Sequence, residues 1–365
     1  MVFSKGKLLF LLKNFIKMAD FHPLQISQLT YPTNDSVQIK FDIPENIKEN
    51  FTYKAGQYVN LQTKIDDKNV RRSYSICSSE DEPLSVLVKK IPEGVFSHYA
   101  MHQLKEGDKI EVQEPEGKFT LSPDLADQTL MAFAAGSGIT PMMSLIKTHL
   151  SNSDSSRLIL VYGNQSPEKT IFKSEIEQLK TDYPDRFFVQ YVFSRSNEDD
   201  AIYGRIDASV VNRMLNKVYA NFDIKKFYLC GPEAMINTVA DLLKERGYTD
   251  DQVAFELFYA ADDDKNAAEA LDGKTQVKVI LDDEEYELTM DQKDVILDAV
   301  LDKDIDAPYS CQGGICSSCV ALLREGEVEM KKNQILADDE VEEGLILTCQ
   351  SLPKSSHIVV DYDDI

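Results

Sequence analysis

The sequence has no long apolar run and little positive charge. No stretch of eighteen or more apolar residues occurs, and a transmembrane helix needs about 20 of them, so we expect no transmembrane segment. Lysine and arginine number 39 against 62 aspartates and glutamates, which leaves a formal net charge of −23. Because proteins that bind nucleic acid offset phosphate charge with basic side chains, a nucleic-acid partner is not expected.

The sequence also lacks the cysteine pattern of a disulfide-rich protein and the catalytic pattern of a hydrolase. Its six cysteines do not form the dense pattern of a disulfide-stabilised domain, and Cys77 and Cys230 lie far apart along the chain. A reducing, cytoplasmic compartment is therefore the expected location. The five histidines form no Ser-His-Asp constellation, and no paired carboxylates point to hydrolytic chemistry.

Residues 1–20 carry lysines around a short apolar stretch, Leu8 to Leu12. The stretch is brief and no small-residue cleavage site follows it, which argues against a signal peptide. Two interpretations remain open: an amphipathic surface helix, or an N-terminal extension upstream of a natural start at Met18. We favour the extension.

The acidic residues are concentrated toward the C-terminus. The segment from Ala261 to Ile365 holds 27 acidic and nine basic residues, a formal charge of −18 out of −23. A solvated, solubilising face would account for this bias. An acidic surface would also steer the protein toward a basic docking site on a partner.

A chain of 365 residues is expected to form two or three domains. Residues 21–125 consist of short alternating segments separated by turns, which predicts an antiparallel β-barrel. Residues 126–258 alternate apolar strands with helical stretches, which predicts an α/β domain with a parallel sheet. The Ala- and Asp-rich segment 259–273 has little to bury and is interpreted as a linker. Strands resume in residues 274–365, the expected third domain.

Four cysteines in this third domain follow the spacing C-x4-C-x2-C and then a distant fourth: Cys311, Cys316, Cys319 and Cys349. This is the ligand spacing of a plant-type 2Fe-2S cluster. Gly313 and Gly314 let the loop wrap around the metal, since glycine tolerates positive φ and close backbone approach. A zinc site is the alternative, but zinc ligands usually come as two close pairs, and here the fourth cysteine has no near partner. The pattern therefore predicts an iron–sulfur cluster and one-electron chemistry.

The end of a barrel strand carries the motif R-x-Y-S within Arg71-Arg72-Ser73-Tyr74-Ser75. Arginine offers a fork for phosphate, tyrosine an aromatic face for a flavin ring, and serine a hydrogen bond near the reactive nitrogen of that ring. Core packing in a strand is the alternative for Tyr74. The motif resembles the flavin-binding signature of the ferredoxin-NADP reductase superfamily. We therefore expect Arg72, Ser73, Tyr74 and Ser75 to contact a flavin, with Tyr74 and Ser75 at the reaction centre.

A second group, Gly94-Val95-Phe96-Ser97, matches the pyrophosphate-binding turn of the same superfamily. Glycine permits close backbone approach there, and the N-terminus of the following helix favours anions. A pyrophosphate site implies FAD rather than FMN. We also expect Val88 and Lys89, in the segment before this turn, to contact FAD.

A glycine turn of the pattern G-x-G-x-T-P joins a strand to a helix and contains Gly136, Ser137, Gly138, Thr140 and Pro141. Such a turn aims backbone N–H groups at a dinucleotide pyrophosphate, although alone it could be an ordinary strand–helix connection. After another strand comes a second segment whose expected contacts with the nucleotide are Cys230, Gly231, Pro232 and Met235. The two segments together resemble the nicotinamide-binding half of the superfamily. That resemblance implies that the Cys230 thiol lies beside the hydride-bearing ring, and a small buried residue at a strand end is the alternative.

Ser194 and Arg195 follow the predicted strand Phe187 to Phe193, where the ribose of the nucleotide should lie. An arginine there can pair with a 2'-phosphate, whereas an NAD enzyme tends to present a carboxylate. NADPH is therefore expected rather than NADH. A solvated loop arginine is the alternative, since acidic residues follow at 198–200.

Motifs for flavin, nicotinamide and an iron–sulfur cluster occur in that order over nearly the whole chain. The sequence resembles the oxygenase reductases that carry a C-terminal plant-type 2Fe-2S domain, and within them the reductase subunits of phenylacetyl-CoA epoxidases. The stretches that carry the resemblance include RRSYSIC, AAGSGITPMM, FYLCGPEAM and PYSCQGGICSSC. The family's H-x-E-R-F segment is matched only in part, because Ala254 and Leu257 replace its histidine and arginine.

The resemblance implies an oxidoreductase that passes electrons from NADPH to FAD and then through the cluster to an oxygenase component. That partner is expected to be a diiron protein that docks on the acidic third domain, for which a β-grasp fold is implied. Nothing in the residues names the final substrate, so a reductase of another ring-hydroxylating or alkane-type oxygenase stays an alternative. A redox sensor or electron carrier without NADPH turnover is the alternative from a different class.

Overall fold

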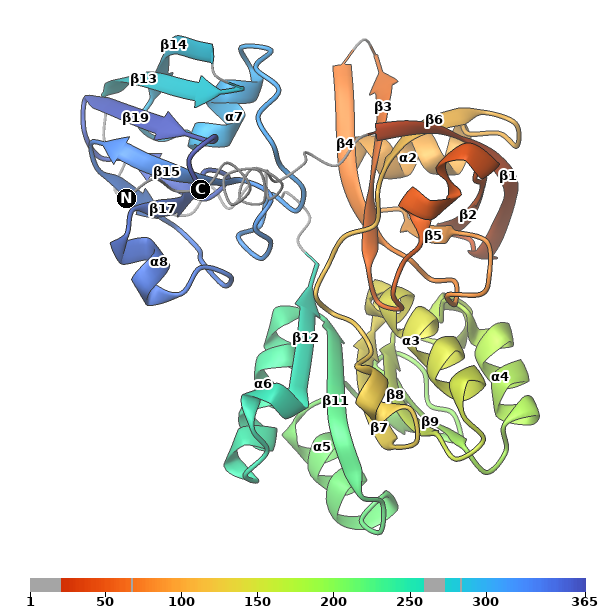
Figure 1. Ribbon diagram of the computed structural model, residues 1–365. Helices are drawn as coiled ribbons and strands as arrows, with labels where there is room; N and C mark the ends of the chain where they lie inside the picture. Colours follow the sequence, from red (N-terminus) through yellow and green to blue (C-terminus); the bar gives the residue numbers. More distant parts are fainter. Residues whose placement is uncertain (1–20, 67, 259–272, 283) are drawn as a thin grey trace, which may run out of the picture.

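The computed structural model describes residues 21–66, 68–258, 273–282 and 284–365. Three main sheets follow one another along the chain: an antiparallel sheet, a parallel sheet and a ferredoxin-type sheet (Figure 1). This arrangement confirms the expected fold class. The N-terminal extension and nearly all of the expected linker lie outside the described residues, and the domain boundaries stay a prediction.

The first sheet is the expected barrel, with the strand order β4-β3-β6-β1-β2-β5. Its strands are β1 (Phe21–Thr33), β2 (Ser36–Asp42), β3 (Tyr58–Ile65), β4 (Lys68–Ser75), β5 (Ser85–Lys89) and β6 (Lys109–Gln113). Each pairing between neighbours is antiparallel. A bridge between Ile76, just after β4, and Val86 in β5 joins the two edge strands and closes the sheet on itself.

Alternating side chains fill the barrel interior, as the two-residue period of a strand requires. Strand β2, for example, buries Val37, Ile39 and Phe41. Helix α2 (Val95–His102) packs against the same core through Phe96. The core therefore holds the start of α2, the expected pyrophosphate turn, firmly against the barrel strands.

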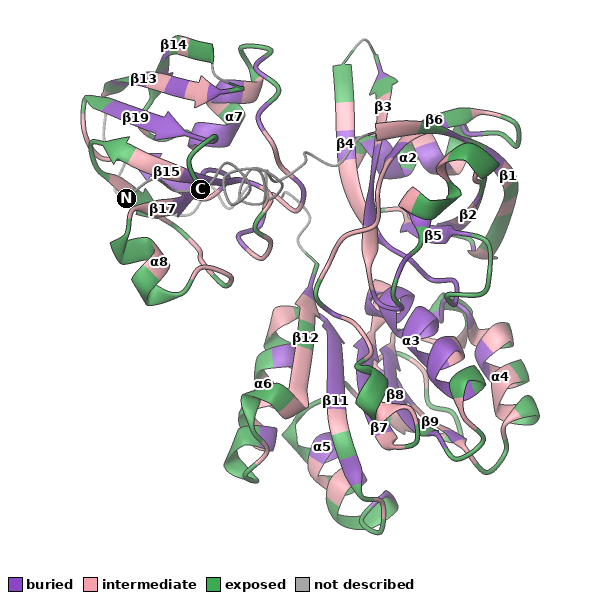
Figure 2. Cartoon of the chain, viewed as in Figure 1, coloured by how far each residue is buried: buried purple, intermediate pink, exposed green. Residues whose placement is uncertain are grey.

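The second sheet is parallel, with the order β10-β9-β8-β7-β11-β12. Its strands are β7 (Thr129–Ala135), β8 (Arg157–Asn164), β9 (Phe187–Phe193), β10 (Ala201–Tyr203), β11 (Ile224–Gly231) and β12 (Val253–Leu257). The helices form two pairs, which share separate buried clusters with the sheet: α3 (Ile139–Asn152) with α4 (Lys173–Asp182), and α5 (Ala208–Arg213) with α6 (Glu233–Glu245). Because helices cover both faces, strands such as β8 are buried along nearly their whole length (Figure 2).

The strand order of this parallel sheet reverses beside β7. Strands β8, β9 and β10 lie on one side of β7, whereas β11 and β12 lie on the other. Ligands of such sheets bind at the carboxyl ends of the strands next to the reversal. The fold therefore directs a nucleotide to the ends of β7 and β11, which carry the glycine turn and Cys230.

The third sheet has the order β14-β13-β19-β15-β17. Its strands are β13 (Lys274–Leu281), β14 (Glu284–Asp291), β15 (Val320–Glu325), β17 (Leu345–Leu347) and β19 (His357–Asp361), and a separate pair joins β16 (Val328–Met330) to β18 (Ser351–Pro353). Strands β13 and β19 run parallel, and the other pairs in the five-stranded sheet are antiparallel. Helix α7 (Ile296–Leu301) buries Ile296, Leu297 and Val300 in the core of this sheet, and α8 (Asp338–Glu342) lies near β17.

Short helical turns complete the described chain: η1 (Glu45–Phe51), η2 (Pro123–Leu125), η3 (Gly136–Gly138), η4 (Pro167–Lys169) and η6 (Asp250–Gln252), with a π-helical turn η5 (Met214–Val218) after α5. Within the described ranges, we find no helix whose length and apolar character would let it cross a membrane.

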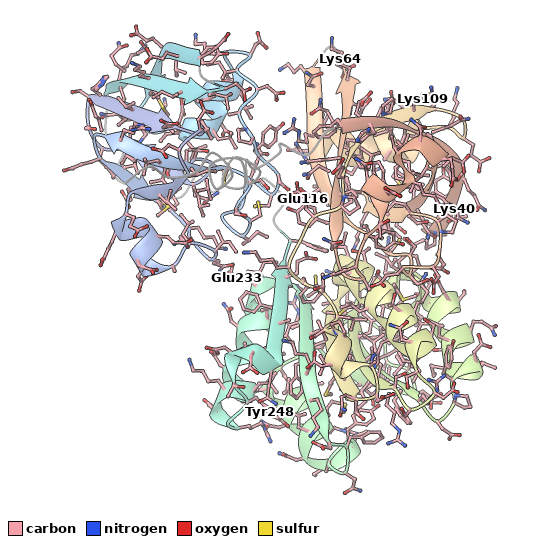
Figure 3. All side chains as sticks on the ribbon, in the orientation of Figure 1. Lys40, Lys64, Lys109, Glu116, Glu233 and Tyr248 are labelled. Atoms are coloured by element: carbon pink, nitrogen blue, oxygen red, sulfur yellow. The ribbon has the colours of Figure 1, made fainter. Side chains whose placement is uncertain are left out.

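The third domain lies beside the barrel and above the start of α6 (Figure 1). In Figure 3, Glu116 and Glu233 mark the parts of the barrel and of α6 that face it. Glu233 forms an ion pair with Lys332 of the third domain, with 3.2 Å between Oε2 and Nζ. The third domain thus contacts both of the others.

Candidate active site

The R-x-Y-S motif ends strand β4, and Arg72 and Tyr74 share one side of that strand. The Tyr74 ring lies 5.4 Å from the ring of Phe96 in α2, and burial raises the pKa of its hydroxyl. Arg72 donates from Nη1 to the backbone carbonyl of Arg71 at 2.7 Å. Tyr74 therefore packs on the barrel helix but keeps partial exposure, and phosphate binding by Arg72 stays a prediction.

Three side chains from two domains meet at the end of this strand. The Ser75 hydroxyl donates to Oε2 of Glu256, in β12, at 3.0 Å. Glu256 pairs in register with Cys230, the buried residue near the end of β11. Burial raises the pKa of the Glu256 carboxyl to about 7. Burial, and next the Glu256 charge, raise the pKa of the Cys230 thiol well above its usual value. A hydroxyl, a carboxyl and a neutral thiol thus lie together between the barrel and the parallel sheet.

Sequence reasoning missed Glu256 as a member of this group. It lies in the segment that matches the family's H-x-E-R-F pattern in part, and it is the glutamate of that pattern. The available signal was a carboxylate near the carboxyl end of the last strand of a parallel sheet, where ligands bind. Its proximity to Ser75 could not be read from the sequence, because 181 residues separate the two.

The glycine turn after β7 lies directly against the end of β11. A Cβ atom on Gly138 would be 2.1 Å from the carbonyl oxygen of Cys230, so only glycine fits there. Gly136 has φ +56°, which glycine adopts readily. Helix α3 begins at Ile139 without a side-chain cap, so the first N–H groups of the helix keep no side-chain acceptor. Such a turn fits a dinucleotide pyrophosphate.

The turn after β11 is equally tight. Gly231 has φ +157°, and a Cβ on it would be 2.8 Å from Cε of Met235. Pro232 precedes α6, which also begins without a side-chain cap. At the end of β8, the side-chain amide nitrogen of Asn164 is buried near the Tyr162 hydroxyl.

The expected pyrophosphate turn of the barrel is also shaped around a glycine. A Cβ on Gly94 would be 2.4 Å from Cγ1 of Ile91 and 2.6 Å from Oγ of Ser97. The Ser97 hydroxyl donates to the Gly94 carbonyl at 3.0 Å, and α2 begins without a side-chain cap. Val95 is half exposed. The hydrogen bond from Ser97 fixes the shape of the turn. The first N–H groups of α2 have no side-chain cap and could bind an anion.

The side chains of Val88 and Lys89, both in β5, lie in different surroundings. Val88 is completely buried in the barrel core, so only its backbone could contact a cofactor. Lys89 extends toward the other domain, where its Nζ lies 3.6 Å from the position that a Cβ on Gly136 would occupy. The structure therefore brings a lysine of the barrel to the glycine turn of the parallel sheet.

Ser194 and Arg195 lie at the same edge of the parallel sheet. Their backbone N–H groups donate to the carbonyls of Asn164 at 3.0 Å and Gln165 at 2.9 Å. The Arg195 side chain is exposed. The position agrees with contact to a ribose, and the choice between the two nucleotides stays a prediction.

The four expected cluster ligands lie in two pairs. Sγ of Cys316 is 3.1 Å from Sγ of Cys311, and the hydrogen bond from Cys316 lowers the pKa of Cys311 to about 6. Cys319 lies next to Cys349, whose hydrogen bond and the burial of the site raise the pKa of Cys319. The Gly313 N–H donates to the Cys311 sulfur at 3.3 Å.

Two pairs of thiols fit a 2Fe-2S cluster, because each of its two irons takes two protein ligands. Gly314 has φ +74°, and a Cβ on it would be 2.7 Å from the carbonyl oxygen of Lys332. The glycine is thus required for the close fit of the cluster loop against a neighbouring segment.

The Ser73 hydroxyl points to the third domain. It donates to Oδ1 of Asn60 at 2.6 Å and lies 2.8 Å from the hydroxyl of Ser310, the residue before Cys311. Tyr58, which is opposite Ser75 in the β3–β4 ladder, has its pKa raised by burial and next by the nearby Cys316. The Ser73 side chain therefore joins the barrel to the cluster loop. Contact between Ser73 and a flavin stays a prediction.

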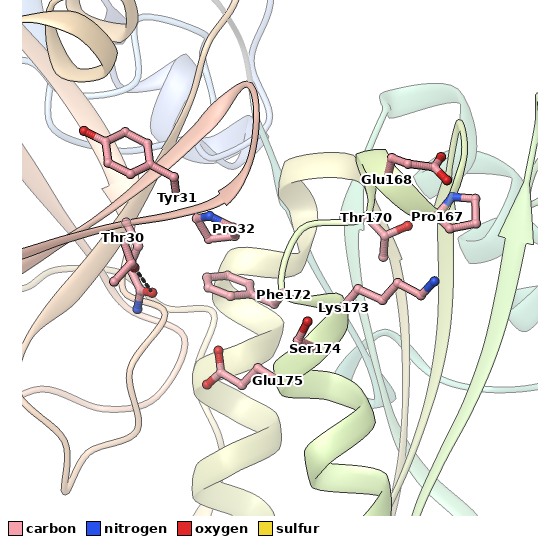
Figure 4. Close-up of a pocket in the computed structure, with 11 residues that line it drawn as sticks. Thr30, Tyr31, Pro32, Pro167, Glu168, Thr170, Phe172, Lys173, Ser174 and Glu175 are labelled. Carbon is pink, nitrogen blue, oxygen red and sulfur yellow. Dashed lines mark hydrogen bonds between the residues drawn. The ribbon is translucent and has the colours of Figure 1, made fainter.

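An open hollow of about 390 Å³ lies elsewhere, between the β1–β2 hairpin and the start of α4 (Figure 4). Its lining includes Tyr31, Phe172 and Lys173. None of the expected site residues contributes to it. We assign it no role in the chemistry.

Three family descriptions match consecutive parts of the chain. An oxidoreductase FAD-binding domain matches residues 23–121, an oxidoreductase NAD-binding domain matches residues 133–241, and a 2Fe-2S iron–sulfur cluster binding domain matches residues 279–354. These are the parts in which the flavin, nucleotide and cluster motifs lie.

The chain is also similar to complete proteins. It is 35% identical over 352 residues to a subunit of the 1,2-phenylacetyl-CoA epoxidase of Escherichia coli strain K12, with 95% of this chain and 99% of that protein covered. The ferredoxin reductase component of 3-ketosteroid-9-alpha-monooxygenase from Mycolicibacterium smegmatis is 32% identical, with 93% and 97% covered. The chain belongs to the three-domain oxygenase reductases. It is thus an NAD(P)H-dependent flavin oxidoreductase of the ferredoxin reductase type, with FAD and a 2Fe-2S cluster as its cofactors.

A solved structure shares the fold of this reductase. Phthalate dioxygenase reductase superposes with a TM-score of 0.64 at 24% identity, and the match covers 93% of this chain and 98% of that one. The three-domain architecture is therefore common to the two proteins.

Proposed function

We propose that this reductase uses NADPH and supplies electrons to an oxygenase that acts on phenylacetyl-CoA. The observation that carries a reductase role is the meeting of Ser75, Glu256 and Cys230 between two domains, with the cluster loop joined to the same barrel through Ser73. The identity of 35% to a phenylacetyl-CoA epoxidase component over nearly the full chain supports the choice of substrate.

We assign the flavin to the barrel residues. Tyr74 would lie against its ring, Ser75 would lie near its reactive nitrogen with an oxygen lone pair free to accept a hydrogen bond, and Arg72 with the first N–H groups of α2 would hold its phosphates. When bound, FAD accepts an electron pair and releases single electrons, and the cluster carries them one at a time. The protein contributes position, exclusion of water and electrostatics.

The nicotinamide side is assigned to the parallel sheet. The Gly136–Gly138 turn and the start of α3 would bind the pyrophosphate, with Lys89 adding a positive charge from the barrel. Cys230 is completely buried and neutral, so contact between its thiol and the nicotinamide ring would require a local rearrangement at the end of β11. Glu256 accepts a hydrogen bond from Ser75, and its pKa of about 7 lets its carboxyl hold a proton near neutral pH.

Selection of NADPH is assigned to Arg195. Its exposed guanidinium follows β9 at the edge where a ribose would lie, and a fork of N–H groups suits a 2'-phosphate. Ser194 would add a hydroxyl at the same place. NADH should bind more weakly, because it cannot use this contact.

The partner we propose is a diiron oxygenase component with a basic docking surface. The segment from Ala261 to Ile365 carries a formal charge of −18, and complementary charge speeds association.

The test is reconstitution of electron transfer with defined partners. The purified reductase is mixed with NADPH and with the oxygenase component of a phenylacetyl-CoA epoxidase, and product formation is measured. The oxygenase component of a 3-ketosteroid 9α-monooxygenase serves as the alternative acceptor, because a relative of that system is 32% identical. Turnover only with the steroid or another ring-hydroxylating system would replace the proposed substrate, and no bleaching of the flavin by NAD(P)H would reject the reductase role.

A further inference from the structure

Arg71 precedes the R-x-Y-S motif and contacts the third domain. Only 8% of Arg71 is exposed. The carbon of its guanidinium group lies 4.7 Å from the ring centroid of Phe21, in β1, and 4.6 Å from that of Tyr309, in the third domain. Both distances are within the range of attractive cation–π contacts. The guanidinium is therefore enclosed between one aromatic ring of the barrel and one of the ferredoxin-type domain.

The hydrogen bonds of Arg71 reach the same two domains. Its Nε donates to Oε1 of Gln62 at 2.9 Å within the barrel. Its Nη1 donates to the backbone carbonyl of Tyr309 at 3.3 Å, and its Nη2 lies 3.5 Å from Oδ1 of Asp306. Asp306 is largely exposed, so that ion pair adds little. The planar fork and the two stacked rings define the geometry of the contact.

The contacted segment leads directly into the cluster loop. Tyr309 is followed by Ser310, which is buried and bonds Asn60 and Ser73 of the barrel at 3.0 Å and 2.8 Å. The next residue is the first expected cluster ligand, Cys311. On the barrel side, Arg71 and Ser73 lie on the same side of β4 as Ser75, which is expected at the flavin.

We propose that Arg71 is a positioning residue for internal electron transfer, which holds the segment Asp306–Ser310 on the barrel so that the cluster stays close to the flavin. This inference rests on the proposed reductase function. An electron moves between two centres at a rate that falls steeply with their separation. Loss of the Arg71 contact should therefore slow reduction of the cluster. Hydride transfer to the flavin should be unaffected, because Arg71 is not among the residues expected to contact the flavin or the nicotinamide.

The experiment uses the full chain with both cofactors and compares Arg71→Met with the parent. Rapid mixing with NADPH follows the flavin and cluster absorbance separately, and EPR measures the reduced cluster. Flavin bleaching should stay within about twofold, and cluster reduction should fall by about tenfold or more. Arg71→Lys keeps the charge and loses the planar fork, so its rate of cluster reduction should fall by an intermediate amount. This variant replaces Arg71→Met in the test if the Met variant does not fold.

Arg246→Met is the matched control, because its guanidinium bonds Asn212 and Asn216 within the parallel-sheet domain alone; it should change neither rate. Hydrogen exchange of the backbone amides of Asp306, Ala307, Tyr309 and Ser310, measured without nucleotide, should rise in Arg71→Met. Unchanged cluster reduction and exchange in the Arg71 variants would overturn the proposal, as would a parallel loss of FAD and of flavin bleaching. A parent protein whose flavin bleaches without any reduction of the cluster would refute the proposed function, and the exchange result would still decide the contact.

Discussion

Ser75 and Glu256 share a hydrogen bond of 3.0 Å although one ends a barrel strand and the other lies in the last strand of the parallel sheet. The contact brings a carboxyl with a raised pKa next to the hydroxyl expected at the flavin. It also places that carboxyl beside Cys230. The proposed reaction centre would therefore lie at the interface between two domains.

Replacement of Glu256 by glutamine should stabilise the protein, and more so at higher pH. Burial raises the Glu256 pKa from 4.5 to about 7, so the folded state binds more protons than the unfolded state between these values, and stability falls as pH rises through that window. The difference in melting temperature between Glu256→Gln and the parent should be smallest below pH 4.5 and level off above about pH 7. Glu245→Gln, at an exposed position, should show no such trend. A pH-independent difference would contradict the raised pKa.

Replacement of Cys349 by serine should remove the cluster and leave the other cofactor in place. The cluster loses one of its four thiolates, whereas the barrel and the parallel sheet keep their own cores. Iron content and the red-brown absorbance should disappear, and FAD content and NADPH–ferricyanide activity should be largely retained. Simultaneous loss of FAD would show that the domains do not fold independently.

Replacement of Arg195 by alanine should weaken NADPH binding far more than NADH binding. A hydrogen bond to a charged group contributes about 1.5–3 kcal/mol, which corresponds to about tenfold to a hundredfold in the KM for NADPH. Steady-state kinetics with both nucleotides measure the effect. Arg213→Ala, at an exposed position in α5, provides the control. An equal change for NADPH and NADH would remove the assignment of the 2'-phosphate.

Replacement of Gly138 by alanine should impair nucleotide binding without loss of FAD. The added Cβ would lie 2.1 Å from the carbonyl oxygen of Cys230, and backbone atoms cannot move aside as a flexible side chain can. The ends of β7 and β11 would separate, which should raise the KM for NADPH and slow flavin bleaching. Gly247→Ala meets no atom within 4 Å and should cost only about 1–2 kcal/mol of stability from backbone strain at positive φ. Normal bleaching in Gly138→Ala would show that the close contact is dispensable.

The sequence alone determined the features that depend on neighbouring residues. The cysteine spacing, the two glycine turns and the change from alternating to mixed strand–helix patterns each reflect a local requirement of the backbone, such as the positive φ at Gly136 and Gly314. These patterns were sufficient to predict three domains, their fold classes and their cofactors, since each glycine turn and three of the four cluster ligands lie in short continuous segments.

Only the tertiary structure decided which distant side chains meet. It placed Glu256 against Ser75, Lys89 at the Gly136 turn, and Arg71 between two aromatic rings 288 positions apart in the chain. Such contacts depend on how separate domains pack, and a hydrogen bond or a stacked ring between them leaves no periodic pattern in either segment. The sequence was therefore sufficient to identify the domains of the reductase and their motifs, whereas the fold determined which side chains of different domains are in contact.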